Sequence, residues 1–206
     1  MVSENASVDT LLRGIDEFFM GEGPVHKTMK ALARRFPEAG VDYAIVGAMA
    51  LVMHGYRRET VDVDVLLSKK GHDLFFETLV GRGYVPAFPG SRKSFRDSET
   101  GIRIDIITEG EYPGDGKPKA VAFPEPSGAS VEMDGIRILT LEKLVELKLA
   151  SGMTAPHRLR DLADVQELIK VRGLGADLGD RLDVSVQAKY RELWDSVQDG
   201  TDEYDG

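Results

Sequence analysis

The sequence predicts an α+β protein, in which a small mixed or antiparallel sheet with flanking helices is followed by a C-terminal helical lobe. Residues 61–65 and 102–107 alternate apolar with charged side chains, as strands with one buried face do. Apolar residues elsewhere recur at helical spacing, and from Thr140 onward only helical spacing remains. We therefore expect an α/β lobe with N-terminal helices over residues 1–139 and a helical lobe with an acidic tail over residues 140–206.

Capping residues and glycines delimit the expected helices. Ser7 or Asp9 can cap the first helix, Pro24 can open the second, and Gly55 can end a short third one. Helices are expected from residue 7 or 9 to about 19, and over residues 24–36, 48–54, 71–80, 140–150, 156–172 and 184–197.

Strands are expected between these helices. Residues 130–139 predict a hairpin, because Asp134-Gly135 suits a type I′ turn. Residues 110–126 are rich in proline and glycine and are typical of a loop with one short strand at most. The remaining strands are expected over residues 43–46, 60–67, 91–97 and 102–107, and near residue 84.

Composition restricts the class of protein. The 206 residues are 42% hydrophobic and 30% charged, as in a globular protein with its own core. The absence of cysteine excludes disulfides and thiolate metal sites, and a net charge of −9 argues against generic nucleic-acid binding. The longest apolar run, residues 43–53, is too short to cross a membrane, and the first ten residues do not resemble a signal peptide. We expect a cytoplasmic location and no membrane partner.

Two strands each carry acids on one face and aliphatic residues on the other. Asp62 and Asp64 alternate with valines, and Asp105 alternates with isoleucines. If these strands are neighbours, Asp105 lies within about 5 Å of one of the first two acids. Three carboxylates at that range can hold two Mg²⁺ ions for an in-line displacement at phosphorus. The alternative is a sheet face that is simply exposed to solvent.

The combined pattern Gly47-Ala48, Arg58-x-Thr60-x-Asp62-x-Asp64 and Asp105 resembles the nucleotidyltransferase superfamily with the polymerase-beta-like fold. It looks most like the branch of AbiEii-type toxins and minimal nucleotidyltransferases. The resemblance implies that Asp62, Asp64 and Asp105 are catalytic and bind two Mg²⁺ ions, which Mn²⁺ can replace, together with an NTP such as ATP. It also implies that Asp105 helps to deprotonate an acceptor hydroxyl.

Four further residues are candidates for nucleotide binding. Gly47 follows a strand and opens a helix, where backbone N–H groups can bind a phosphate; alternatively, it only lets helix and strand pack closely. The family usually has Gly or Ser after this glycine, so Ala48 keeps the backbone donor but lacks a hydroxyl. Arg58 and Thr60 share the alternation of the strand aspartates, and Arg58 either neutralises a phosphate or pairs with an acid.

Lys148 and Asp161 lie on helical stripes that are otherwise apolar. Buried charges need partners, so the two residues either pair with each other or face the nucleotide. The run Arg158-x-x-Asp161 and Lys148 match, in order, a lysine and a later aspartate that serve the active site in the related toxins. The resemblance therefore favours nucleotide binding for both.

The leading hypothesis is a Mg²⁺-dependent transferase that moves a nucleoside monophosphate from an NTP to a hydroxyl of an RNA, a protein or a small molecule. A toxin–antitoxin role, with an antitoxin protein as partner, follows from the resemblance alone. One alternative is a non-catalytic nucleotide-binding or interaction module on the same fold, which Ala48 favours. A second is a metal-dependent phosphohydrolase that uses the same carboxylates.

Overall fold

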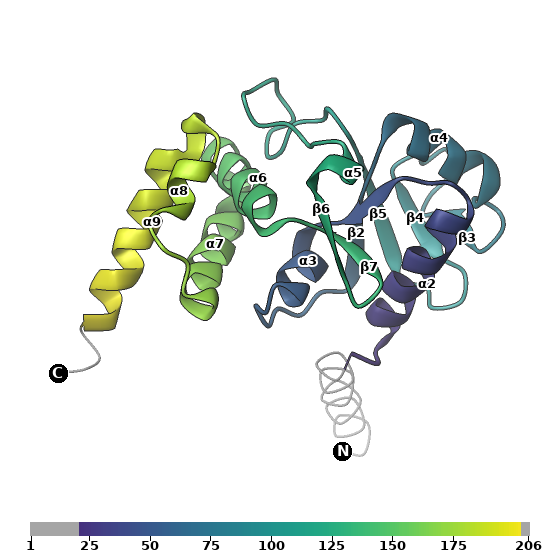
Figure 1. Cartoon of the computed structure of the whole chain (residues 1–206). Coiled ribbons are helices and arrows are strands. Elements are labelled where there is room, and N and C mark those ends of the chain that lie inside the picture. The colour runs from purple at the N-terminus through teal and green to yellow at the C-terminus, as the bar shows by residue number, and fades with distance from the viewer. Residues whose placement is uncertain (1–20, 203–206) are drawn as a thin grey trace, which may run out of the picture.

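The computed structural model describes residues 21–202, and the first predicted helix lies outside this range (Figure 1). Each of the other predicted helices and strands is present, with ends shifted by a few residues. The α-helices are α2 (Pro24–Glu38), α3 (Gly47–Met53), α4 (Lys69–Thr78), α5 (Pro126–Ala129), α6 (Leu141–Thr154), α7 (Leu159–Arg172), α8 (Leu178–Arg181) and α9 (Val184–Asp202), with a 3-10 turn at Pro156–Arg158. The strands are β1 (Tyr43–Ile45), β2 (Asp62–Leu67), β3 (Tyr84–Pro86), β4 (Ser94–Asp97), β5 (Arg103–Thr108), β6 (Ser130–Met133) and β7 (Ile136–Leu139).

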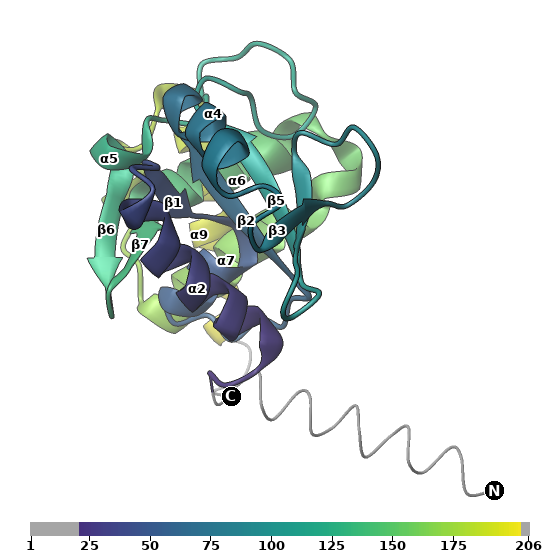
Figure 2. The ribbon, with the colours of Figure 1, turned by 90° about the vertical axis from the view of Figure 1, so that its right-hand side faces the viewer.

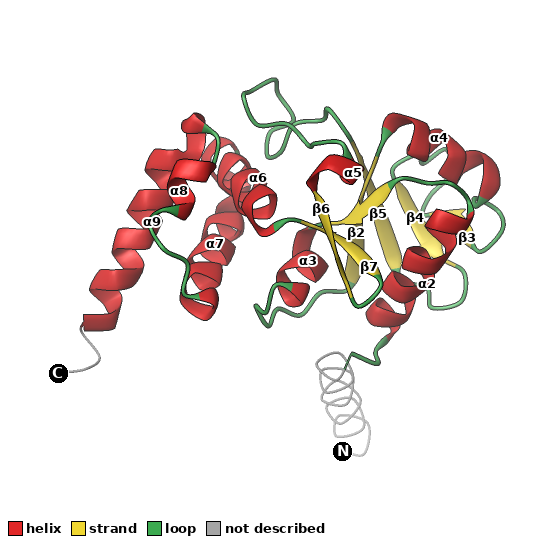
Figure 3. Cartoon of the chain, viewed as in Figure 1, coloured by secondary structure: helices red, strands yellow, loops and turns green. Residues whose placement is uncertain are grey.

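The strands form one mixed seven-stranded sheet in the order β3-β4-β5-β2-β1-β7-β6 (Figure 3). The pairs β2/β5 and β1/β7 are parallel, and the other neighbours are antiparallel. The predicted α+β class with a mixed sheet is therefore confirmed. The two strands that carry the candidate aspartates lie side by side near the middle of the sheet.

Helices cover the two faces of the sheet unequally. Helices α2 and α4 lie against one face, and α6, α7 and α9 lie on the opposite side (Figures 1 and 2). Val63, Val65, Ile104 and Ile106 join the apolar cluster that includes residues of α2 and α4. Because side chains alternate along a strand, the aspartates of β2 and β5 are left on the other face, toward the C-terminal helices.

A second apolar cluster joins this other face to the C-terminal helices. It contains Val46, Ala50 and Leu139 together with buried residues of α6, α7 and α9. The α/β part and the helical part therefore share a core, and a site between them is held by packing on both sides. No helix within residues 21–202 is long and apolar enough to span a membrane.

The structure confirms the turn chemistry of the hairpin and corrects the long loop. Asp134 and Gly135 have φ values of 51° and 74°, as a type I′ turn requires. Residues 110–126 contain no strand: the Gly110 amide donates to the Phe123 carbonyl at 2.8 Å and the Phe123 amide to the Glu111 carbonyl at 2.8 Å, without a longer ladder. Helices α5 and α8, of one turn each, had no clear signal in the sequence.

Candidate active site

A cavity of about 320 Å³ lies between the sheet, the loop 110–126 and the helical part of the chain. Its polar lining comes from all three sources, and its apolar lining includes Leu144, Leu147 and Phe123. A wall of this kind suits a nucleoside, whose base is flat and largely apolar. The polar lining residues used below are Gly47, Asp64, Asp105, Lys148, Ser151, Arg158 and Asp161.

The sheet brings the strand aspartates together as the sequence predicts. In the parallel ladder between β2 and β5, Asp64 pairs with Asp105 and Asp62 pairs with Arg103. Paired residues of neighbouring strands point to the same face, so three carboxylates and one guanidinium form a compact block. The conditional prediction that Asp105 adjoins the first pair is confirmed by this register.

Gly47 is required by the position of Asp64. It has φ of +62°, and a Cβ at this position would lie 2.0 Å from Oδ2 of Asp64. The amide of Val46, just before it, donates to the carbonyl of Asp64 at 3.0 Å. The close-packing interpretation of this glycine is therefore supported directly, while its predicted contact with a phosphate stays a prediction.

Asp64 is the most perturbed acid of the site. Burial, and after it the charges of Asp62 and Asp105, raise the pKa of Asp64 to about 6, against the opposing charges of Lys148 and Arg158. The hydrogen bond from Arg103 to Asp105 in turn raises the pKa of Arg103. The block thus has more negative charge than its neighbours neutralise, which is a setting that attracts a cation.

The donor chemistry of this block fits Mg²⁺ or Mn²⁺, which prefer carboxylate oxygens. Its side chains are not arranged for ligation, and within residues 21–202 no three acidic or histidine groups are grouped to hold an ion. Thr60 donates to Asp62 at 2.6 Å, and Arg103 donates to both oxygens of Asp105 at 2.9 and 2.8 Å. To ligate a metal ion, Asp62 would therefore have to give up its hydrogen bond from Thr60, and Asp105 its contacts with Arg103.

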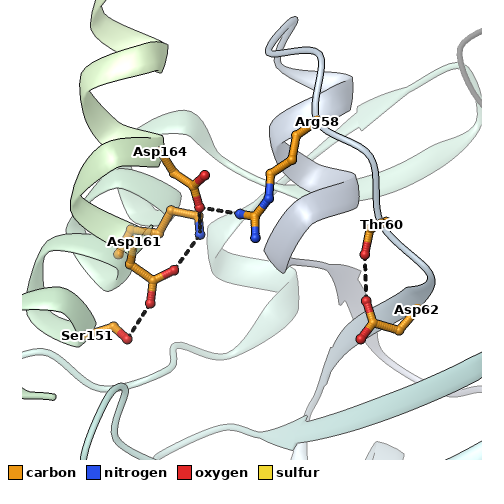
Figure 4. A network of polar contacts seen from close by, with 7 residues as sticks. Arg58, Thr60, Asp62, Ser151, Asp161 and Asp164 are labelled. Atoms are coloured by element: carbon orange, nitrogen blue, oxygen red, sulfur yellow. Dashed lines mark hydrogen bonds and ion pairs between the residues drawn. The ribbon is translucent and has the colours of Figure 1, made fainter. Parts of the chain in front are cut away.

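The helical part contributes a second polar cluster. Lys148, with 7% of its surface exposed, donates to Asp161 and Asp164 at 2.8 Å each. Ser151 donates to Asp161 at 2.6 Å, and Arg58 donates to Asp164 from the segment before β2 (Figure 4). Burial by itself would raise the pKa of Asp161, but Lys148, Ser151 and Arg158 together hold it below the ordinary value.

These contacts decide between the alternatives for the basic residues. Lys148 and Asp161 do pair with each other, and both also line the cavity, so their pairing is confirmed while nucleotide binding stays a prediction. Arg58 pairs with a buried acid and does not line the cavity, as its ion-pair alternative predicts. Figure 4 shows Thr60 and Asp62 turned toward each other, apart from the Arg58–Asp164 contact.

The predicted site residues do not all line the same cavity. Arg58, Thr60 and Asp62 line a second, more open hollow of about 660 Å³, which includes Arg160. Ala48 is buried with 7% exposure and lines neither hollow, so its side chain has no place in a nucleotide site. The strand aspartates therefore stand where the two hollows approach each other, with Asp64 on one side and Asp62 on the other.

Sequence reasoning missed Asp164 and the importance of Arg103. Asp164 is only 1% exposed and accepts from two cations. A signal for it was present, because residues 161, 164, 165 and 168 follow the spacing of one helical face. Arg103 lies on the same strand face as Asp105, but no sequence pattern shows that it donates hydrogen bonds to both oxygens of this carboxylate.

Neither a protein-family model nor a curated protein matches this sequence. Among solved structures, the antibiotic-resistance factor ANT(2'')-Ia is similar over 85% of this chain and 96% of that chain, with 12% identity and a TM-score of 0.52. The chain has the nucleotidyltransferase fold. At this identity the similarity establishes the fold, and the activity has to be argued from the site.

Two further structures are similar at a lower level. A complex of ANT(2'')-Ia with adenylyl-2''-tobramycin matches over 81% of this chain and 99% of that one, with 14% identity and a TM-score of 0.48. A protein of Thermotoga maritima assigned as a nucleotidyltransferase matches over 66% and 89%, with 18% identity and a TM-score of 0.46. The narrower AbiEii-type resemblance stays a prediction.

Proposed function

We propose that the protein is a Mg²⁺-dependent nucleotidyltransferase that moves a nucleoside monophosphate from an NTP to a hydroxyl group. The observation that carries the proposal is the parallel register of Asp64 and Asp105 at the wall of a cavity that also contains Gly47, Lys148 and Asp161. Acids on adjacent strands, beside a cavity large enough for a nucleoside, are the arrangement that phosphoryl-type transfer requires.

The residues would divide the work as follows. Asp62, Asp64 and Asp105 would hold the metal ions, which when bound neutralise the phosphates and align the reacting oxygens. Lys148 has three N–H groups, of which two are used by Asp161 and Asp164, so one is left for a phosphate oxygen. Asp161 fixes the orientation of that ammonium group, and Arg158 adds positive charge at the same wall.

The proposed reaction balances without a further reagent. The acceptor hydroxyl oxygen forms a bond to the α-phosphorus, the bond from that phosphorus to the bridging oxygen breaks, and pyrophosphate leaves. The hydroxyl proton passes to Asp105, which lines the cavity and is the acid expected to act as base. The acceptor class remains RNA, protein or small molecule, and the toxin–antitoxin role rests on the sequence resemblance alone.

Transfer of label from an α-³²P NTP tests this function directly. The protein is incubated with Mg²⁺ or Mn²⁺ and with total RNA, total protein or hydroxylated antibiotics, and all products are analysed by mass spectrometry. Asp64→Ala is expected to lower the rate about a thousandfold, since metal-held charge is worth several kcal/mol in the transition state. Asp73→Ala, an exposed acid of α4, is the matched control and should leave the rate unchanged.

A non-catalytic nucleotide-binding module is the second candidate. It is favoured by the contacts that already occupy two of the three carboxylates, namely Thr60 on Asp62 and Arg103 on Asp105. This candidate predicts NTP binding that is equal in wild type and Asp64→Ala, with no product on any acceptor. Measuring NTP affinity alongside label transfer separates the two functions.

A further inference from the structure

Arg103 contacts both carboxylate oxygens of Asp105, one of the three catalytic candidates. It lies two residues before Asp105 on β5, so both side chains project from the same face of the sheet. Its Nε donates to Oδ1 of Asp105 at 2.9 Å, and its terminal nitrogen lies 2.8 Å from Oδ2. A guanidinium bound in this two-pronged way engages both oxygens through which Asp105 would ligate a metal ion.

The surroundings hold Arg103 in this position. Its Nε also lies 3.1 Å from Oγ of Ser94, a buried residue of β4 that is the register partner of Asp105. On its other side, Arg103 is the register partner of Asp62. The arginine is therefore placed inside the block of carboxylates, with an anchor on the neighbouring strand.

We propose that Arg103 is a built-in counter-ion that competes with the divalent metal for Asp105. The inference rests on the proposed metal-dependent function. In the metal-free protein, Arg103 balances part of the negative charge of the block and keeps Asp105 turned toward itself. A metal ion that enters must displace the guanidinium, so Arg103 weakens metal binding and is a positioning residue for Asp105.

The size of the effect follows from the exposure of the pair. The side chain of Arg103 is 53% exposed and that of Asp105 is 24% exposed. Exposed pairs contribute at most about 1 kcal/mol, so the competition is worth about threefold to fivefold in metal affinity. An effect of this size still allows the metal to bind.

Binding of Mn²⁺, counted as loss of the free-ion signal in electron paramagnetic resonance, tests the proposal without any assay of transfer. Arg103→Gln is expected to bind Mn²⁺ about threefold to fivefold more tightly than wild type. Arg103→Lys keeps the charge but not the two-pronged contact, and its affinity should fall between the two. Asp105→Asn should bind more weakly than wild type.

Arg96→Gln is the matched control. Arg96 is the register partner of Arg103 on β4, is exposed, and donates to the carbonyl of Gly101 at 3.0 Å, so its removal changes net charge equally and close by. Its Mn²⁺ affinity should stay within about twofold of wild type. Circular dichroism melting of each variant confirms that the fold is kept, as expected for exposed arginines.

The outcomes separate the inference from the function on which it rests. If wild type binds Mn²⁺ and Arg103→Gln binds it equally or more weakly, the competition is overturned while the metal site stands. If Arg96→Gln gains as much Mn²⁺ affinity as Arg103→Gln, or if Arg103→Lys binds Mn²⁺ as wild type does, the effect comes from net charge alone. The two-pronged contact between Arg103 and Asp105 then has no role. If no variant binds Mn²⁺ at millimolar concentration, the metal-dependent function itself is overturned.

Discussion

The two acidic clusters of the site differ in how their charge is balanced. Asp161 and Asp164 on α7 face two cations, the buried Lys148 and the partly buried Arg58, and the cluster is neutral by itself. Asp62, Asp64 and Asp105 on the sheet have one direct cationic partner among the described residues, Arg103 on Asp105. The pKa values follow this difference, because that of Asp161 is lowered while that of Asp64 is raised to about 6.

This difference indicates separate roles for acids that look alike in the sequence. A cluster that is neutral without a ligand stabilises the fold and orients Lys148. A cluster that keeps excess negative charge is less stable alone and gains most from an added cation. The same substitution, Asp to Asn, should therefore have opposite effects on stability in the two clusters.

The largest effect on stability is expected for Asp164→Asn. The change leaves the buried Lys148 and the partly buried Arg58 beside one remaining acid, so the free energy of unfolding should fall by about 3 to 5 kcal/mol. Urea unfolding at pH 7.5 measures it, with Asp73→Asn on the exposed face of α4 as the control for net charge. A loss below about 1 kcal/mol would show that the helical cluster is not a stabilising one.

Asp64→Asn should have the opposite sign and a pH dependence. The folded-state pKa of about 6 lies above the ordinary value of 3.8, so the folded protein binds the proton more tightly than the unfolded chain. The contribution of Asp64 to the free energy of unfolding is then largest below pH 3.8, and up to about 3 kcal/mol of it is lost as the pH rises through about 6. The variant lacks this loss and should be the more stable protein at pH 7.5.

Unfolding in the presence of EDTA at several pH values between 3.5 and 8 checks this prediction. The curves for wild type and Asp64→Asn should converge at low pH and diverge between about pH 4 and 6. Parallel curves would contradict the view that the strand cluster is short of positive charge.

Gly47→Ala should have the smallest effect on stability. It tests how little space the Asp64 side chain leaves beside residue 47. Gly40 is a matched control, because it has φ of +69° and no atom within 4 Å of the position that a Cβ would take, whereas Gly47 has both positive φ and the carboxylate. Each substitution should lose about 1 kcal/mol to backbone strain, and Gly47→Ala somewhat more from the clash. In an Asp64→Ala background most of the difference should disappear, because only the Cβ of residue 64, at 3.0 Å, still meets the added methyl group. Persistence of the full difference would exclude the carboxylate clash as its cause.

Much of the fold could be predicted because its signals are local. Pro24 at a helix start, the Asp134-Gly135 turn and the alternation in β2 each depend on a few adjacent residues, and all three are confirmed. The one-turn helix α8 and the course of residues 110–126 depend on contacts that are distant in sequence. Gly114, for example, packs so closely on α6 that a Cβ would lie 2.8 Å from the carbonyl of Ser151.

The candidate site was predictable in its acids and less so in its cations. Strand alternation by itself places Asp62, Asp64 and Asp105 on the strand faces opposite the aliphatic residues. Arg58 has the same alternation as Thr60, yet its long side chain reaches Asp164, which is 106 residues away in the chain. Arginine and lysine side chains extend over several ångströms, so their partners depend on tertiary packing more than on spacing.

The sequence by itself determined most of the helices and strands, and which acids project from the face that is not apolar, because these follow from the periods of the backbone. Only the tertiary structure decided that β2 and β5 are parallel neighbours with Asp64 beside Asp105. It also decided that Lys148 and Arg58 share Asp164, and that Arg103 occupies Asp105. The physical reason is that strand order and ion pairing depend on how segments distant in the sequence pack together, and local periodicity does not specify that packing.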